Sequence, residues 1–183
     1  MKNIIIMFRT LTLLVGITVA PLFFMNVVFA SQESDIQRLK YIEAINSLVT
    51  RYMRIYDTQE PALYLSLFAK NAVVYSMGKK ITGDENIRQI VIGLKKQFDQ
   101  LKEAGTPIWV YHQLSNSEIT ILNETEAQHQ AYWTATVIDA EGKTTTPIIG
   151  GYKDKLVKQA NGEWLFAQRE ILSFGPPPKM PKK

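Results

Sequence analysis

The stretch RYMRIYDTQEPALYLSLFAKNAVV, residues 51–74, decides the fold of this chain. It starts inside an amphipathic helical pattern, breaks at Thr58–Pro61, and continues through a short helical segment into an apolar strand-like run. Asp57 falls in the last turn of the first predicted helix, beside the negative end of the helix dipole, where cations are favoured. Because a carboxylate lowers helix stability there, Asp57 is the first candidate for a functional residue.

The first 30 residues have the pattern of a secretory signal peptide. The N-terminal region carries two basic residues, Lys2 and Arg9, and a long apolar run follows. Val28 and Ala30 place small residues at the two positions that signal peptidase recognises. We therefore expect cleavage before Ser31, export to the periplasm or the medium, and no membrane attachment of the mature chain. The apolar run is also about long enough to span a bilayer, so an uncleaved anchor is the alternative.

The remaining chain has the length of a single domain, predicted over residues 31–174, followed by a disordered Pro- and Lys-rich tail at 175–183. The formal net charge of the whole chain is +4, and two of those charges lie in the leader. No basic stripe indicates a nucleic-acid partner. With 2 histidines far apart and no cysteine, no metal site is predicted, and without a glycine-rich phosphate loop no cofactor is expected.

Helical periodicity dominates the first half of the mature chain. A first helix is predicted from about Asp35 to Tyr56, and a short one over residues 62–69. A third begins at a capping box, Thr82–Glu85, and ends at Gly105. The stripe of the first helix consists of Ile36, Leu39, Ile42, Ile45, Leu48 and Tyr52.

The period then changes to 2, which is typical of strands. The predicted strands are Ala72–Ser76, Ile108–Leu114, Glu118–Leu122, Glu126–Ile138, Thr146–Val157 and Trp164–Ser173. Met77–Lys80 and Ser115-Asn116 are predicted turns, and Gly150-Gly151 indicates a bulge or bend. Helices followed by an antiparallel meander predict an α+β fold. We expect a cone-shaped barrel with three helices on a strongly curved sheet, whose apolar hollow suits a small ligand.

Several motifs in this order resemble the SnoaL-like branch of the nuclear transport factor 2-like superfamily. They are Tyr52 to Asp57, Pro61, Leu67-Phe68-Ala69, Ala72-Val73-Val74, Ile81-Thr82-Gly83 with Ile87-Arg88, His112 with Asn116, Gly151-Tyr152-x-Asp154, Gly162-x-Trp164 and Arg169. The superfamily includes ketosteroid isomerase, scytalone dehydratase, bile-acid dehydratase, polyketide cyclases, epoxide hydrolases and non-catalytic binding proteins. The resemblance therefore implies the fold and a homodimer formed through the sheet, but not one activity.

Asp57 and His112 are the predicted catalytic pair. In dehydratases of this resemblance, an acid at the end of the first helix shares the cavity with a histidine on a strand. Removing a proton beside a carbonyl and expelling a hydroxyl requires a base and an acid. His112 also alternates with apolar residues along its predicted strand. The alternative is an aspartate in solvent and a satisfied core histidine, which the sequence cannot distinguish.

Two tyrosines flank the predicted acid. Tyr56 is adjacent to Asp57, as in the scytalone dehydratase pattern, and Tyr52 lies five residues before it, as in the bile-acid dehydratase pattern. A phenol can polarise a substrate carbonyl, so we expect Tyr52 to orient a substrate oxygen and Tyr56 to contact substrate. Ordinary helix packing is the alternative for both.

Three strand residues complete the predicted substrate-binding set. Arg169 falls on an apolar strand face and could hold an anionic group, or form an ion pair with an acid on the neighbouring strand. His129 and Trp133 share one alternating face, although a single bulge would reverse it. Dehydratases of this resemblance often have a second acid or histidine on this strand. Trp133 is expected in the core or cavity wall.

The sequence thus supports two hypotheses. One is an exported, cofactor-independent lyase or isomerase that acts on a small, cyclic, partly apolar substrate. The other is a non-catalytic periplasmic binding module that uses the same cavity. The position of Asp57 and the strand face of His112 favour the enzyme. Against it, the sequence does not securely identify a second acid or histidine on a strand.

Overall fold

The computed structural model describes residues 20–76, 78–144 and 148–174. The predicted leader up to residue 19 and the predicted tail from residue 175 lie outside this part of the chain. The chain divides into two units, Met1–Lys40 and Tyr41–Lys183. Among the residues whose burial is described, every member of the hydrophobic core belongs to the second unit. No helix within the described residues is both long and apolar enough to cross a membrane.

The first helix is longer than the periodicity predicted. Helix α1 spans Ala20–Thr58, so the described helix runs through the predicted cleavage point without a break. Ile36 and Leu39 are exposed, which means that the predicted apolar stripe is wrong at its start. Ile42 is half-buried, and the rest of the predicted stripe, Ile45, Leu48 and Tyr52, is buried as expected.

The break after α1 has a backbone cause. Gln59 adopts a positive φ of 56°, which ends the helix, and Pro61 takes the first position of the next one. This helix, α2, spans only Pro61–Leu65 and not residues 62–69 as predicted. The helix ends early because strand β1 already begins at Phe68. Leu67 and Phe68 are both buried in the core.

Helix α3 spans Asp84–Glu103 and ends, as predicted, before a glycine with positive φ, Gly105. The predicted capping box is wrong. Thr82 is the last residue of a strand, and Gly83 is the N-cap without a side-chain cap hydrogen bond. Asp84 and the residue after it still place negative charge in the first turn, where the helix dipole favours it.

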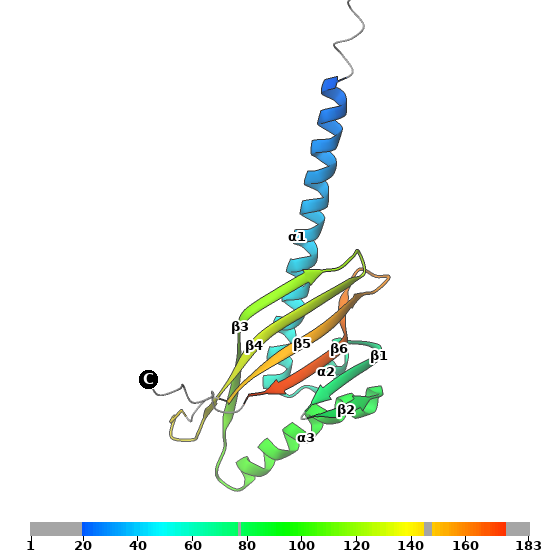
Figure 1. Cartoon of the computed structure of the whole chain (residues 1–183). Coiled ribbons are helices and arrows are strands. Elements are labelled where there is room, and N and C mark those ends of the chain that lie inside the picture. The colour runs from blue at the N-terminus through cyan, green and yellow to red at the C-terminus, as the bar shows by residue number, and fades with distance from the viewer. Residues whose placement is uncertain (1–19, 77, 145–147, 175–183) are drawn as a thin grey trace, which may run out of the picture. The chain divides into compact units, whose positions relative to one another are not determined.

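Six strands form one curved, open sheet (Figure 1). The strands are β1 (Phe68–Ser76), β2 (Lys79–Thr82), β3 (Trp109–Ile121), β4 (Glu126–Ile138), β5 (Ile148–Lys158) and β6 (Trp164–Ser173). Their order is β2-β1-β6-β5-β4-β3. All neighbours are antiparallel except β1 and β6, which pair in parallel. The α+β prediction is confirmed, with a curled sheet that remains unclosed.

Strands β4 and β6 match their predicted bounds, whereas β2 was predicted as part of a turn. The two strands predicted around Ser115-Asn116 are one strand, β3. Asn116 has a φ of 51°, and the pairing with β4 shifts between Ser115 and Glu118. The predicted turn is therefore a β-bulge, which reverses the faces of the residues that follow it.

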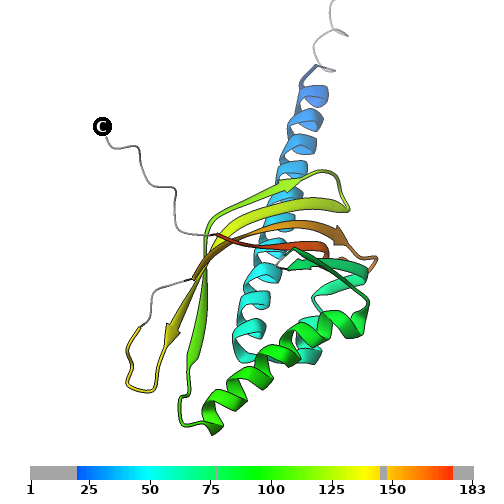
Figure 2. The same ribbon diagram turned by 60° about the horizontal axis from the view of Figure 1, so that its bottom comes forward.

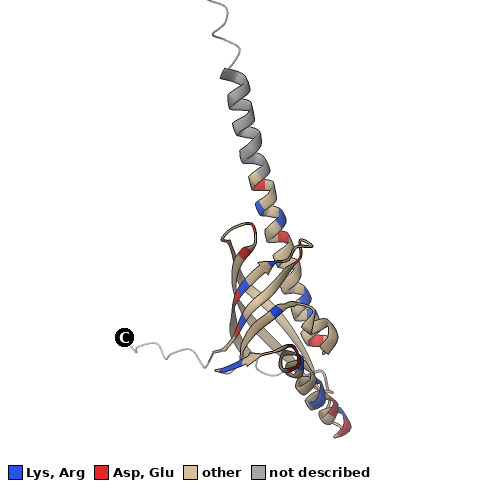
Figure 3. Ribbon diagram, turned by 90° about the vertical axis from the view of Figure 1, so that its right-hand side faces the viewer, with Lys and Arg blue, Asp and Glu red and all other residues tan. Residues whose placement is uncertain are grey.

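The helices and the sheet enclose the core on one face of the strands. Along β4 the residues alternate strictly between buried and exposed from Glu126 to Trp133. Helix α3 lies beneath the curved sheet, near β1 and β2 (Figure 2). Acidic and basic residues are interspersed along α3 and the strands within the described part of the chain (Figure 3).

The sequence predicts a bulge or bend at Gly150-Gly151, and the structure shows no bulge there. The pairing of β5 with β4 keeps one register from Val157 to Ile148, straight through both glycines. A Cβ atom added to Gly150 would lie 2.1 Å from the Leu172 carbonyl oxygen and 2.3 Å from the Trp133 ring. Close approach of the neighbouring strands and of one side chain is thus the reason for glycine here.

Candidate active site

Asp57 and His112 lie in direct contact, as the sequence hypothesis required. The Asp57 Oδ1 atom is 2.5 Å from His112 Nδ1, and Asp57 Oδ2 accepts a hydrogen bond of 3.1 Å from the His112 backbone N–H. The side chain of Asp57 is 17% exposed and that of His112 is 10% exposed. The carboxylate at the end of α1 therefore fixes both the backbone and the ring of a residue on the edge strand β3.

This contact determines the chemistry that the imidazole can perform. If Nδ1 donates its proton to the carboxylate, Nε2 carries the lone pair of the neutral ring. Within the described part of the chain, no hydrogen bond is formed by Nε2. Nε2 is the ring atom that can take a proton from a bound molecule and return it.

Two aromatic side chains contact the imidazole. The Tyr56 ring meets it edge to face at a centroid distance of 5.1 Å, and the Trp133 ring lies tilted at 5.8 Å. Burial, followed by the nearby charges of Tyr52 and Asp57, raises the pKa of Tyr56 well above its ordinary value. Its phenol thus stays protonated and can donate a hydrogen bond. The surroundings of His112 are apolar and aromatic on these sides.

The structure groups Tyr52 with a second cluster. Its hydroxyl is 3.4 Å from that of Tyr64, and its ring lies 3.8 Å from the guanidinium carbon of Arg169. Tyr52 stacks on Tyr56 at 5.8 Å and contacts Tyr152, which in turn stacks on Trp133, so aromatic contacts connect it to the residues around His112. The expected role of Tyr52 in orienting a substrate oxygen stays a prediction, and core packing is the contact that the structure shows.

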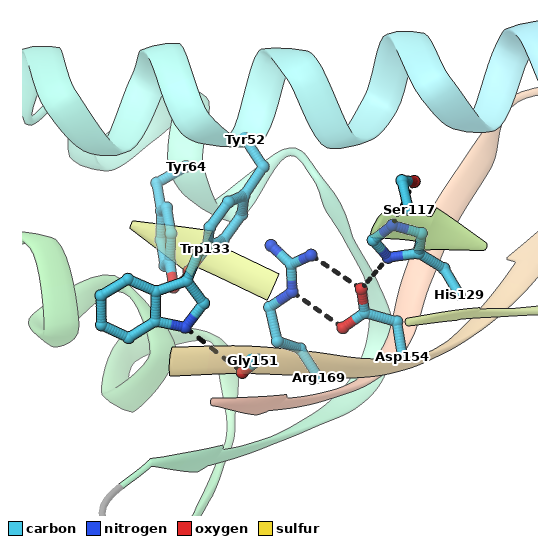
Figure 4. Close-up of polar contacts among 8 residues, drawn as sticks. All are labelled: Tyr52, Tyr64, Ser117, His129, Trp133, Gly151, Asp154 and Arg169. Carbon is cyan, nitrogen blue, oxygen red and sulfur yellow. Dashed lines mark hydrogen bonds and ion pairs between the residues drawn. The ribbon is translucent and has the colours of Figure 1, made fainter. Parts of the chain in front are cut away.

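The second cluster is a chain of polar side chains across four strands, buried at His129, Asp154 and Arg169 and exposed at Ser117 (Figure 4). Arg169 on β6 donates two hydrogen bonds to Asp154 on β5, of 2.8 Å from Nε and 2.7 Å from Nη2. Asp154 Oδ2 is also 2.7 Å from His129 Nδ1 on β4. His129 Nε2 is 3.1 Å from the hydroxyl of Ser117 on β3. We call these four residues the polar rung.

Burial and pairing set the charges of the polar rung. Burial would raise the pKa of Asp154, but the charge and hydrogen bonds of Arg169, with the hydrogen bond from His129, lower it below its ordinary value. Burial likewise opposes the charge of Arg169, and Asp154 outweighs it, so the pKa of Arg169 is raised. The pair is therefore ionised in the interior.

The order Ser117, His129, Asp154 has the geometry of a nucleophilic triad, but its electrostatics oppose that role. A triad carboxylate stabilises the imidazolium that forms when the serine loses its proton. Here Arg169 already neutralises Asp154 from the other side, and the side chains of His129 and Asp154 are 0% exposed. We interpret the polar rung as a structural network.

Sequence reasoning found two members of the polar rung, His129 and Arg169, and assigned both to substrate. It left Asp154 and Ser117 out of the candidate site. The signal for Asp154 was present, since the ion pair with a neighbouring acid was the alternative for Arg169. The signal for Ser117 was hidden, because only the bulge at Asn116 turns it toward His129.

A pocket lies on the other face of the sheet. It has a volume of about 290 Å³. Its lining comprises Glu118, Thr120, Gln128, His129, Gln130, Lys153, Asp154, Lys155, Gln168 and Glu170. Most of these residues occupy the exposed positions of their strands, and neither Asp57 nor His112 contributes to it.

The family model of the SnoaL-like domain matches residues 37–170. Among solved structures, a provisionally assigned scytalone dehydratase from Novosphingobium aromaticivorans is 24% identical and has a TM-score of 0.63, covering 77% of this chain and 89% of its own. LinA is 18% identical with a TM-score of 0.63, over 79% of this chain and 99% of its own. Aln2 from a Streptomyces species is 18% identical with a TM-score of 0.62, over 73% of this chain and 90% of its own. No protein of curated function matches.

At these identities the solved structures establish a common fold. The family match is broader evidence, since it extends from α1 through β6. This chain therefore belongs to the SnoaL-like domain family of the nuclear transport factor 2-like superfamily.

Proposed function

We propose that this protein is a cofactor-independent lyase or isomerase that moves a proton on a small, cyclic, partly apolar substrate. The observation that carries the proposal is the double contact of Asp57 with the ring and the backbone of His112. A carboxylate at a helix end is costly for the helix, and here it orients a partly exposed imidazole.

In this mechanism His112 carries the proton and Asp57 holds the ring. Nε2 removes a proton from the carbon beside a carbonyl, and the resulting imidazolium is stabilised by Asp57. The same proton then passes to a leaving hydroxyl, which departs as water, or to a different carbon, which gives an isomer. Tyr56, protonated because it is buried, donates a hydrogen bond to the carbonyl oxygen as charge develops there.

The test compares Asp57→Asn and His112→Ala with the unchanged protein on a panel of cyclic hydroxyketones, following water loss by absorbance. We expect each change to lower kcat by at least about a hundredfold, the usual contribution of general acid–base catalysis. The thermal midpoint should stay within a few degrees or rise, since functional sites often sacrifice stability.

The matched control is Glu60→Gln, which neutralises an exposed acid just beyond the same helix. It should leave turnover unchanged. If the unchanged protein binds panel members but never converts them, and Asp57→Asn binds them equally well, the chain is a binding module and the enzyme proposal is wrong.

Export is a further part of the proposal, supported by the sequence pattern of residues 1–30. N-terminal sequencing of the protein from a periplasmic fraction should begin at Ser31. Recovery of a chain starting at Met1 from the membrane fraction would instead support the uncleaved anchor.

We also propose a homodimer formed through the outer face of the sheet. Exposed apolar residues on β3, β4 and β5 support it, among them Tyr111, Tyr132 and Ile149, each about half exposed. Light scattering should give twice the monomer mass for the unchanged protein and the monomer mass for Tyr132→Glu. A monomeric unchanged protein would refute the dimer.

A further inference from the structure

The indole ring of Trp133 packs against the backbone of β5 at Gly150, where the missing side chain leaves room for it. Trp133 lies directly opposite Gly150 in the pairing of β4 with β5. A Cβ atom at Gly150 would come within 2.3 Å of two atoms of the indole ring. The same Cβ would lie 2.1 Å from the Leu172 carbonyl oxygen, so any other residue at position 150 would displace both the indole ring and the neighbouring strand β6.

The indole ring of Trp133 forms two further contacts with β5. Its N–H group donates a hydrogen bond of 3.3 Å to the Gly151 carbonyl, and its ring stacks on Tyr152 at a centroid distance of 6.0 Å. The side of the indole that remains contacts His112 at 5.8 Å. Trp133 is only 7% exposed, so this arrangement belongs to the core.

We propose that Trp133 is a positioning residue for His112, and that Gly150 is required because it admits the indole beside the Leu172 carbonyl of β6. The inference rests on the proposed function, since it concerns the same imidazole. Asp57 fixes one ring nitrogen, Tyr56 contacts the ring edge to face, and Trp133 limits its rotation from β4. Together they hold Nε2 in one direction before any substrate binds.

The experiment observes the imidazole directly by nitrogen-edited NMR of the histidine rings in the free protein. The loss of signals in His112→Ala assigns the His112 resonances, which leaves His129 as an internal reference. Trp133→Leu removes the aromatic contact, Trp133→Phe restores part of it, and Trp109→Leu is the matched control. Trp109 is 48% exposed on the same strand as His112, on the opposite face.

We expect the Nδ1–H proton of His112 to exchange with water roughly threefold to tenfold faster in Trp133→Leu, because one aromatic contact is lost. Trp133→Phe should recover much of the protection, and Trp109→Leu should change nothing. The His129 signals should be unaffected in all three. Unchanged His112 exchange in folded Trp133→Leu would overturn the proposal, as would an equal loosening of His129.

Substitutions of the two glycines test whether the packing of the Trp133 ring on β5 requires glycine at position 150. Gly150→Ala should displace the indole and change the His112 signals or prevent folding. Gly151→Ala should leave both in place, because its Cβ would meet mainly the far edge of the Phe174 ring, at 2.9 Å. A Gly150→Ala protein with wild-type stability and His112 signals would refute the role of the glycine.

These readouts need no substrate. If His112→Ala keeps full turnover, the proposed function fails, while the NMR result for Trp133 still decides whether the indole positions the ring. If turnover depends on His112 and Trp133→Leu leaves the ring signals unchanged, only the present inference fails.

Discussion

Arg169 carries a full charge in the interior because Asp154 neutralises it through two short hydrogen bonds. Aromatic rings contact the guanidinium as well, with the ring centroids of Tyr52, Phe166 and Tyr152 within 4.2 Å of its central carbon. Asp154 occupies Nε and Nη2, whereas Nη1 is buried and has no hydrogen-bond partner among the described residues. An anionic group would therefore have to bind at Nη1 alone or displace Asp154. The geometry therefore favours the ion pair over the anion-binding role, and the latter stays a prediction.

Because the pKa of Asp154 is lowered in the folded protein, the free energy of unfolding should decrease at acidic pH. Its folded pKa lies below the ordinary value of 3.8, so its contribution is fully present above that pH and is lost as the pH falls through the folded pKa. Asp154→Asn leaves Arg169 buried without a counter-charge, which should cost about 3–5 kcal/mol at neutral pH. Urea unfolding at several pH values should show the deficit narrowing below the ordinary pKa.

Asp99→Asn provides the matched control, because Asp99 pairs with Lys95 on the exposed surface of α3. Its loss should cost less than about 1 kcal/mol. An Asp154→Asn deficit as small as that of Asp99→Asn would contradict the interpretation of the polar rung as a structural network.

The β-bulge at Asn116 reverses which residues of β3 face the core. It therefore positions both His112 and the Ser117 end of the polar rung. Before the bulge, His112 and Leu114 face the core, whereas after it Ser117 contacts buried His129 and Ile119 packs on the core. Asn116 absorbs the extra residue by adopting a left-handed backbone, a conformation that asparagine tolerates better than most residues. Without it, Ser117 would point away from His129.

Substitutions at Asn116 should follow backbone conformation. Asn116→Val should destabilise the protein by about 1–2 kcal/mol, because a β-branched residue is strained at positive φ. Asn116→Gly should be neutral or slightly stabilising. Thermal unfolding of the two variants checks this, and equal midpoints would show that the bulge does not depend on the residue at its centre.

These features explain what the sequence could and could not predict. Periodicity identified α3, β4 and β6 because each buries one regular stripe or face. The four residues of β2 are too few for a period and resembled a turn. The bulge in β3 resembled a turn for the same reason, since both are marked by asparagine or glycine. The partnership of Asp57 with His112 came from the family resemblance, whereas Asp154 needed the strand order, which no local pattern encodes.

The core of the Tyr41–Lys183 unit contains several neighbouring phenols. Tyr52, Tyr64 and Tyr152 are buried, and Tyr56 is nearly so. Burial is the main cause that raises the pKa of each. Groups with a raised folded pKa stabilise the protein below their unfolded pKa of 10.0, and that stability is lost as the pH rises further.

Alkaline titration should therefore detect the buried tyrosines. Just above pH 10, the phenols of Tyr52, Tyr56, Tyr64 and Tyr152 should stay protonated in the folded protein, because burial raises the pKa of each. Ultraviolet absorbance of tyrosinate in buffer should reach only part of the signal seen in urea. Full ionisation under both conditions, with the protein still folded by circular dichroism, would contradict the described core.

The parallel pairing of β1 with β6 joins strands from opposite ends of the domain, with Val74 beside Arg169. Such a contact closes a very long loop, and distant pairings of this kind form slowly. A nascent chain cannot complete its interior until the last strand has left the ribosome. Until then, β1 lacks the strand that pairs with it in parallel, and the backbone groups of that edge stay open to other contacts.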